Sequence, residues 1–220
     1  MKVFSRYGVR LNGGTITISD NSEVRIESSI SLRIRFKLST VSEVVVLRKD
    51  NEYRLRINNE GKLVFEVYDG SDYEPCVIGP KIDCGQWYDV VASVVVGDTI
   101  AKAMYVNSIE NKYVEETQSG SVGATTNNLV IGGFDGVVDL FMVYKPALSE
   151  DKVVRIFERE FVPYGLRYYL SIEEGDGNNL YDVVKGYEAS ADSNIEWVMG
   201  KELEDLYSSG GKIVLVKKYM

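Results

Sequence analysis

The stretch from Gly132 to Phe157 reads Gly-Gly-Phe-Asp-Gly-Val-Val-Asp-Leu-Phe-Met-Val-Tyr-Lys-Pro-Ala-Leu-Ser-Glu-Asp-Lys-Val-Val-Arg-Ile-Phe. Its glycines permit a tight turn, and the apolar residues 137–144 predict a strand that ends before Pro146. Ser149 is placed as the N-cap of a short helix near 149–158, because acidic residues come after it and apolar residues recur on one face. The stretch therefore predicts a turn, a strand and a helix in that order.

This order resembles the closing part of laminin-G-like domains in the concanavalin A-like lectin/glucanase superfamily. Residues 85–92 are similar to the family's Gly-x-Trp-x-x-Val-Ala strand, and residues 104–107 to its Leu-Tyr-Val-Asn strand. The resemblance implies an all-β fold, a two-sheet antiparallel jelly roll, with one short helix near 149–158. It also implies that Trp87 and Tyr105 pack in the framework. Function stays open because the fold hosts lectins, hydrolases, receptor modules and structural proteins.

The composition is that of an ordinary soluble domain. The 220 residues are 45% hydrophobic and 26% charged, which suits one all-β domain with a full core. No apolar run approaches the roughly 20 residues of a membrane span, so we expect no membrane insertion. The first residues lack the apolar stretch of a secretory signal, and the location stays open. Abundant Val, Ile, Tyr, Glu and Lys are typical of a thermophilic source.

Several kinds of chemistry are excluded. The chain has no histidine, which removes Ser-His-Asp and Cys-His catalysis and most zinc and iron sites. The net charge of −8 argues against a nucleic acid as partner. Glycanases of the superfamily carry paired carboxylates on one strand face. The nearest pair here, Glu66 and Asp69, is spaced to lie on opposite faces. We therefore predict a protein that is not an enzyme.

Two alternating segments, 29–38 and 52–58, predict strands with one apolar and one basic face. The basic faces are either solvated or a platform for an acidic partner or an anionic glycan. Leu140 and Met142 stand where the family usually has charged residues, so that face is expected to be covered by the tail or by a partner. The candidates for partner binding are Arg33, Arg35, Lys37, Arg54, Arg56, Leu140 and Met142.

The C-terminal part departs from the family order. Residues 165–182 and 196–201 resemble the opening of a laminin-G-like domain, whereas residues 7–13 resemble the segment that comes directly after such an opening in the family. We expect residues 1–161 to form the main part of the jelly roll. Residues 162–220 either complete the same domain, as in a circular permutant, or complete a neighbouring subunit's.

The charges of the tail fit either arrangement. Residues 173–205 carry ten acidic and two basic side chains, which complement the basic faces of the strands. Residues 212–219 predict a further strand that could add to an exposed sheet edge of the same or another chain.

Three further predictions concern small sites. Cys76 and Cys84 flank a turn that could bring them within reach of a disulfide, with two thiols as the equal alternative. Exposed aromatic residues suit glycan contact, and the candidates are Tyr68, Tyr73, Tyr113 and Tyr187. No cofactor is required. The family's common ion is Ca²⁺, for which the oxygen ligands available are Asp135, Asp139, Asp176, Asn178 and Asp182.

The sequence supports two functions. The favoured prediction is a non-enzymatic structural or surface protein, a subunit of a virion, an appendage or a cell-surface assembly, whose partners are copies of itself or another structural protein. The rotated tail, the covered apolar strand and the extra terminal strand favour it. The alternative is a monomeric lectin-like carbohydrate-binding module with a glycan as partner, which rests on the family resemblance.

Overall fold

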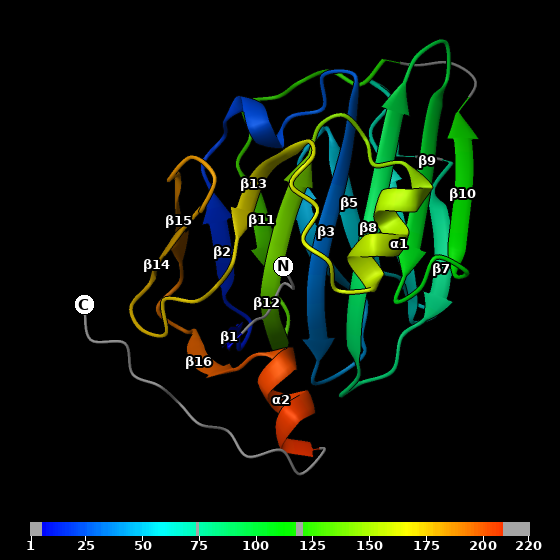
Figure 1. Cartoon of the computed structure of the whole chain (residues 1–220). Helices are drawn as coiled ribbons and strands as arrows, with labels where there is room; N and C mark the ends of the chain where they lie inside the picture. The colour runs from blue at the N-terminus through cyan, green and yellow to red at the C-terminus, as the bar shows by residue number, and fades with distance from the viewer. Residues whose placement is uncertain (1–5, 74, 118–120, 209–220) are drawn as a thin grey trace.

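The computed structural model describes residues 6–73, 75–117 and 121–208, which form two eight-stranded antiparallel sheets packed face to face (Figure 1). The first sheet runs in the order β10 (Lys112–Thr117), β9 (Ile100–Val106), β8 (Trp87–Val96), β3 (Ser29–Leu38), β12 (Gly136–Tyr144), β1 (Tyr7–Arg10) and β16 (Glu196–Met199), and β13 (Leu166–Leu170) also pairs with β12. The second runs in the order β14 (Asn179–Tyr181), β15 (Glu188–Ala191), β2 (Thr15–Ile18), β11 (Leu129–Gly132), β4 (Val44–Lys49), β5 (Tyr53–Ile57), β6 (Lys62–Val67) and β7 (Val77–Lys81). The predicted all-β jelly-roll sandwich is confirmed.

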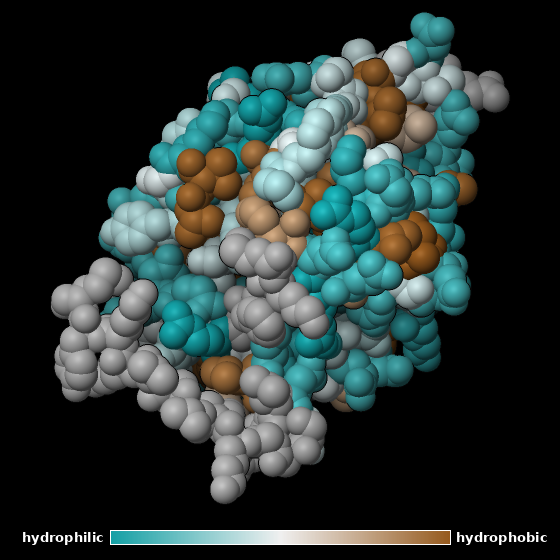
Figure 2. All heavy atoms as spheres, in the orientation of Figure 1, coloured by the Kyte–Doolittle hydropathy of each residue, from teal (hydrophilic) through white to brown (hydrophobic). Residues whose placement is uncertain are grey.

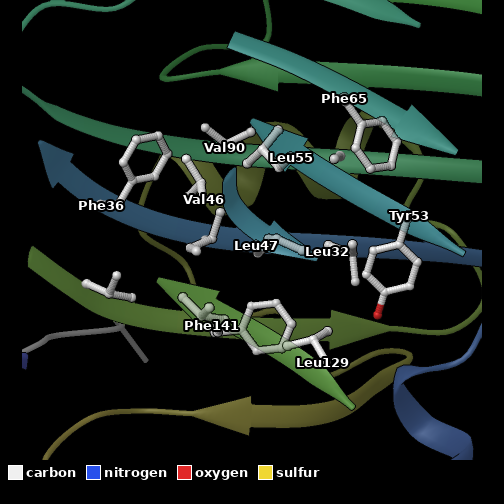
Figure 3. Close-up of a cluster of buried hydrophobic side chains, with 14 of the residues drawn as sticks. Leu32, Phe36, Val46, Leu47, Tyr53, Leu55, Phe65, Val90, Leu129 and Phe141 are labelled. Atoms are coloured by element: carbon white, nitrogen blue, oxygen red, sulfur yellow. The ribbon is translucent and has the colours of Figure 1, made fainter. Parts of the chain in front are cut away.

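The core lies between the sheets and follows the alternation read from the sequence. The predicted strand 29–38 is β3, and its apolar positions are all buried. In Figure 3, Phe36 and Leu32 of β3 lie with Leu55 and Phe65 of the second sheet and with Phe141 of β12. Because side chains alternate along a strand, the residues between these positions lie on the outer faces of the sheets.

Helix α1 (Glu150–Phe157) covers the outer face of the first sheet, as Figure 1 shows. Ser149 occupies its N-cap position as predicted, although its side chain makes no capping hydrogen bond. Val153 and Ile156 of the helix pack in one buried cluster with Leu140 and Met142. These two residues are therefore covered by the chain itself, which corrects their assignment as candidates for partner binding. A 3₁₀ turn, η1 (Ser22–Val24), and helix α2 (Lys201–Ser208) were not predicted.

The C-terminal strands pair with strands of the same chain. In the first sheet β13 pairs with β12, and β16 pairs with β1, with Trp197 opposite Val9. In the second sheet β15 pairs with β2, with Ala189 opposite Ile18, and β14 pairs with β15. In the single chain, residues from both ends thus lie side by side in both sheets. The predicted strand over 212–219 lies outside the described residues.

The two cysteines do not form a disulfide. Cys76 is half-buried just before β7, and Cys84 is exposed in the turn before β8. Of the two alternatives for this pair, the structure has the thiols.

Candidate functional site

Two of the three basic residues of β3, Arg33 and Arg35, are buried in ion pairs, and the third, Lys37, is paired with Glu204. Arg33 donates to Asp89 of β8 through Nε at 2.9 Å and Nη2 at 2.6 Å. Arg35 donates through Nε to Asp139 of β12 at 2.9 Å. Each arginine is 1% exposed, which corrects their assignment to an open platform. Burial alone would lower the pKa of the Arg33 guanidinium, but the adjacent Asp89 outweighs it and the pKa is raised.

The other half of the predicted basic platform lies on the second sheet. Neither α1 nor α2 covers the outer face of this sheet. Arg54 and Arg56 point outward from β5, with side chains 34% and 22% exposed. Both donate through Nε to Glu66 on β6, at 2.9 Å from Arg56. The carboxylate is itself 1% exposed, so it fixes the two guanidinium groups from beneath.

Two of the predicted tyrosines lie beside these arginines. The guanidinium carbon of Arg54 is 4.0 Å from the centroid of the Tyr73 ring. The rings of Tyr68 and Tyr73 are 5.2 Å apart between centroids, and the Tyr73 hydroxyl accepts a hydrogen bond from the Asn51 backbone N–H at 2.9 Å. We call the group of Arg54, Arg56, Glu66, Tyr68 and Tyr73 the tyrosine-arginine cluster.

The loop between β6 and β7 brings Tyr73 into position. The Asp69 carboxylate accepts hydrogen bonds from the backbone N–H groups of Ser71 and Asp72, each at 2.9 Å. These bonds lower the pKa of Asp69 and fold the loop into a compact turn. The ring of Tyr73 therefore returns over β5 instead of extending into water.

A groove continues the tyrosine-arginine cluster along the same face. It has a volume of about 250 Å³, and its lining residues are Thr15, Val44, Val45, Arg48, Val130, Gly132 and Gly133. Register places it next to the cluster, because Arg48 is opposite Arg54 and Val45 is opposite Arg56. Glycines leave part of the lining without side chains. The face therefore offers guanidinium groups, aromatic rings and a groove in one continuous area.

The remaining predicted tyrosines lie elsewhere. Tyr113 is on β10 of the first sheet and packs against the core. Tyr187 is 37% exposed beside β15, and β2, β11 and β4 separate that strand from β5. Sequence reasoning also missed two residues of this face, Glu66 and Arg48. The outward alternation of Glu66 on β6 was visible, but its role depends on the neighbouring strand.

The predicted calcium ligands do not gather into a site within the described residues, where no group of three acidic side chains could hold a metal ion. Asp139 binds Arg35 and also accepts from the Lys201 backbone N–H at 2.8 Å. Asp182 accepts from the backbone N–H groups of Tyr169 and Lys185, each at 2.7 Å. Asp135 accepts from the Ser39 hydroxyl, and Asp176 and Asn178 are exposed. Calcium binding stays a prediction.

A larger pocket, of about 520 Å³, lies on the outer face of the first sheet over β8, β9 and β10. Its walls include Val95, Val114, three alanines and four charged residues, of which Lys112 is paired with Glu150 at 2.6 Å. On this side of the molecule hydrophilic side chains predominate, and hydrophobic ones form small separate patches (Figure 2). We favour the second sheet, because the aromatic residue of this pocket, Tyr105, is only 4% exposed, whereas Tyr68 and Tyr73 are half-buried beside hydrogen-bonding groups.

The family is established by comparison of the sequence with known families. The model described as the concanavalin A-like lectin/glucanases superfamily matches residues 11–154. The chain belongs to this superfamily. The match ends in α1, so β13 to β16 lie beyond it. No curated protein matches the sequence.

Solved structures of similar fold are distant in sequence. A candidate carbohydrate-binding protein from Bacteroides ovatus ATCC 8483 aligns with a TM-score of 0.67 and 14% identity, over 91% of this chain and 61% of that one. A heptameric SAP-like pentraxin from Limulus polyphemus aligns with a TM-score of 0.58 and 15% identity, over 90% of this chain and 96% of that one. The receptor-binding domain of the botulinum neurotoxin C/D mosaic serotype aligns with a TM-score of 0.58 and 14% identity, over 82% of this chain and 54% of that one. At these identities the likeness is one of superfamily fold alone.

The chain thus spans less than two thirds of the Bacteroides protein and about half of the neurotoxin domain. In the described part of the chain, neither helix has the length and apolar character that crossing a membrane requires.

Proposed function

We propose that the chain is a non-catalytic carbohydrate-binding module and that its ligand binds on the outer face of the second sheet. The observation that carries the proposal is the stacking of Arg54 on Tyr73, with Tyr68 beside it and the groove adjoining. Aromatic rings offer an apolar face to the C–H groups of a sugar, and guanidinium groups donate several hydrogen bonds in a fixed fork. A few polar groups beside an apolar surface are typical of ligand sites.

The comparisons support this proposal in a general way. One neighbour is a candidate carbohydrate-binding protein and another is a receptor-binding domain, and both share the fold. Glu66 and Asp69, the carboxylates nearest to a glycanase pattern, are engaged by the two arginines and by the loop N–H groups. Neither is placed to act as an acid or a nucleophile on a bound sugar, so we propose binding without catalysis.

The test is a glycan array probed with the full chain, with and without Ca²⁺, and then affinity measurements for the glycans that bind. The double variant Arg54→Ala/Tyr73→Ala should lose binding. The matched control is Lys152→Ala/Tyr164→Ala, because Lys152 Nζ lies 3.9 Å from the centroid of the exposed Tyr164 ring on another surface. Equal loss in both variants, or none in either, would place the ligand elsewhere.

The role as a virion or appendage subunit stays a prediction, as does a thermophilic source. Pairing of the tail within one chain is compatible with a monomer, and strand exchange remains the alternative. The native mass over a wide range of concentration distinguishes the two: a strict monomer excludes exchange, whereas a defined oligomer that is lost when the tail is removed supports assembly.

A further inference from the structure

Helix α2 begins on a buried cluster of charges. The backbone N–H of Lys201 donates to Asp139 at 2.8 Å, and the Glu202 carboxylate accepts from Arg35 Nη2 at 2.9 Å. Arg35 also donates to both oxygens of Asp139, at 2.9 and 3.1 Å. This guanidinium therefore binds two carboxylates, one from its own sheet and one from α2. Glu202 is 3% exposed.

Two further acidic residues of α2, Glu204 and Asp205, also accept hydrogen bonds from other parts of the chain. Lys37 Nζ lies 2.7 and 2.8 Å from the two oxygens of Glu204, and the Trp87 indole N–H donates to the same carboxylate at 2.8 Å. Asp205 accepts from Arg159 Nη2 at 3.0 Å. Three acidic residues of the helix thus meet three separate sets of donors. We call the receiving residues the basic strip: Arg35, Lys37, Trp87 and Arg159.

Ion pairs and hydrogen bonds to charged groups attach the described part of the helix. None of the described side chains of α2 belongs to either buried apolar cluster. Partly exposed ion pairs such as Lys37 with Glu204 contribute little to stability, because water screens them. When the buried pair of Arg35 and Glu202 opens, the Glu202 carboxylate regains its hydration. Arg35 is not left alone, because it still binds Asp139. Since α2 comes after β16, the last strand of the described residues, its release leaves the described strand pairings of both sheets in place.

We propose that the basic strip is a docking site for an acidic helical segment of a partner protein, and that α2 occupies the site in the free chain until such a segment displaces it. The occupant we infer carries carboxylates at the spacing of Glu202, Glu204 and Asp205, because each of these is received by its own donors. The net charge of −8 disfavours a nucleic acid as the occupant. The site lies on the first sheet and is independent of the proposed carbohydrate face.

The experiment uses a fluorescent peptide with the sequence of residues 199–208 and two forms of the full chain. In the variant Glu202→Gln/Glu204→Gln the chain's own helix is a weaker competitor. The peptide should therefore bind this variant about tenfold more tightly than the wild type. Affinity should fall as salt is raised. A peptide with glutamine at both positions, or a variant that adds Lys37→Gln/Arg159→Gln, should bind weakly.

Hydrogen exchange of the wild type gives a second readout that does not depend on the peptide. The amides of α2 should exchange faster than those of β3, and faster still at high salt, without a change in β3. Equal peptide affinity in both chains, or α2 protection that does not respond to salt, would overturn the proposal. Dimerisation of the wild type with the variant would also overturn it, because the occupant would then be α2 of a second copy.

Discussion

The guanidinium of Arg54 stacks on the ring of Tyr73, 4.0 Å from its centroid. A cation over an aromatic face at an exposed site contributes about 0.5–1 kcal/mol, so the pair orders two side chains that would otherwise move freely. Order of this kind reduces the entropy that a ligand must remove on binding. The ring of Tyr73 contacts Arg54, whereas its hydroxyl bonds to the Asn51 backbone. Substitutions can therefore test the two parts of the side chain separately.

The change Tyr73→Ala removes the ring and frees Arg54, and should lower the affinity for an array-selected glycan about tenfold. Tyr73→Phe keeps the ring and loses only the bond to the Asn51 N–H, so it should retain most of the affinity. Isothermal titration measures both. A larger loss in the phenylalanine variant would mean that the hydroxyl, and not the ring, contacts the ligand.

Glu66→Gln tests the support of the tyrosine-arginine cluster. With the buried negative charge removed, Arg54 and Arg56 lose the carboxylate they share, and Arg56 keeps only Glu43 at 3.7 Å, so the free energy of unfolding should fall by about 2 kcal/mol. The control is Glu60→Gln, whose pair with Lys62 is exposed and should change stability by less than about 0.5 kcal/mol. Urea denaturation measures the free energy of unfolding of both variants. Equal losses would contradict the role of Glu66 in holding Arg54 and Arg56.

Leu140→Ala tests the packing under α1. Leu140 is 1% exposed beneath Val153 and Ile156, and the cavity left behind should cost about 2–4 kcal/mol. Val114→Ala, at a side chain that is 63% exposed, should be close to neutral. Denaturation experiments measure the free energy of unfolding of both variants. If Leu140→Ala lost no more stability than Val114→Ala, α1 would not cover Leu140 in solution.

Asp20 predicts a specific dependence on pH. The hydrogen bond from Arg25 lowers the pKa of this carboxyl to about 2, against the opposing effect of burial and with the help of Lys49. A depressed pKa stabilises the fold at pH values above the unfolded pKa near 4, and the stabilisation is lost as the pH falls toward 2. Its size is about 2 kcal/mol. Stability curves of wild type and Asp20→Asn should differ at pH 6 and converge near pH 2. Parallel curves would contradict the prediction.

The cysteines provide a chemical test. Because Cys76 and Cys84 are thiols in the structure, reducing agent should leave the melting temperature unchanged, and thiol titration of the unfolded protein should find both groups. A disulfide would contribute about 2–4 kcal/mol. A drop in melting temperature on reduction would therefore establish the bridge.

Much of the fold could be predicted because it depends on local patterns. The alternation over 29–38 corresponds to β3 residue for residue, and the glycine turn before β12 and the helix after it lie where expected. Helix α2 was not predicted, because its acidic side chains are held by Arg35 and Lys37 of the distant strand β3 and no local pattern shows these contacts.

The candidate site was harder to predict, because the availability of a side chain depends on its neighbours in the fold more than on its residue type. Arg33 and Arg54 occupy equivalent outward positions on alternating strands, but Arg33 is buried against Asp89 and Arg54 stays half-exposed over Tyr73. The difference arises from segments that cover one sheet and not the other. Sequence reasoning found Arg54, Arg56, Tyr68 and Tyr73 separately, and only the loop geometry brings them together.

Strand β1 lies between β12 and β16, and β2 lies between β11 and β15. A ribosome releases β1 and β2 long before any of these neighbours exists. The nascent polypeptide must therefore keep β1 and β2 without these partners until β11 and β12 have been made, and their second partners, β15 and β16, follow later still. Contacts this remote in sequence form slowly and leave sheet edges open to misassociation meanwhile. Closure of the two sheets around β1 and β2 is thus expected to be a late step in the folding of this domain.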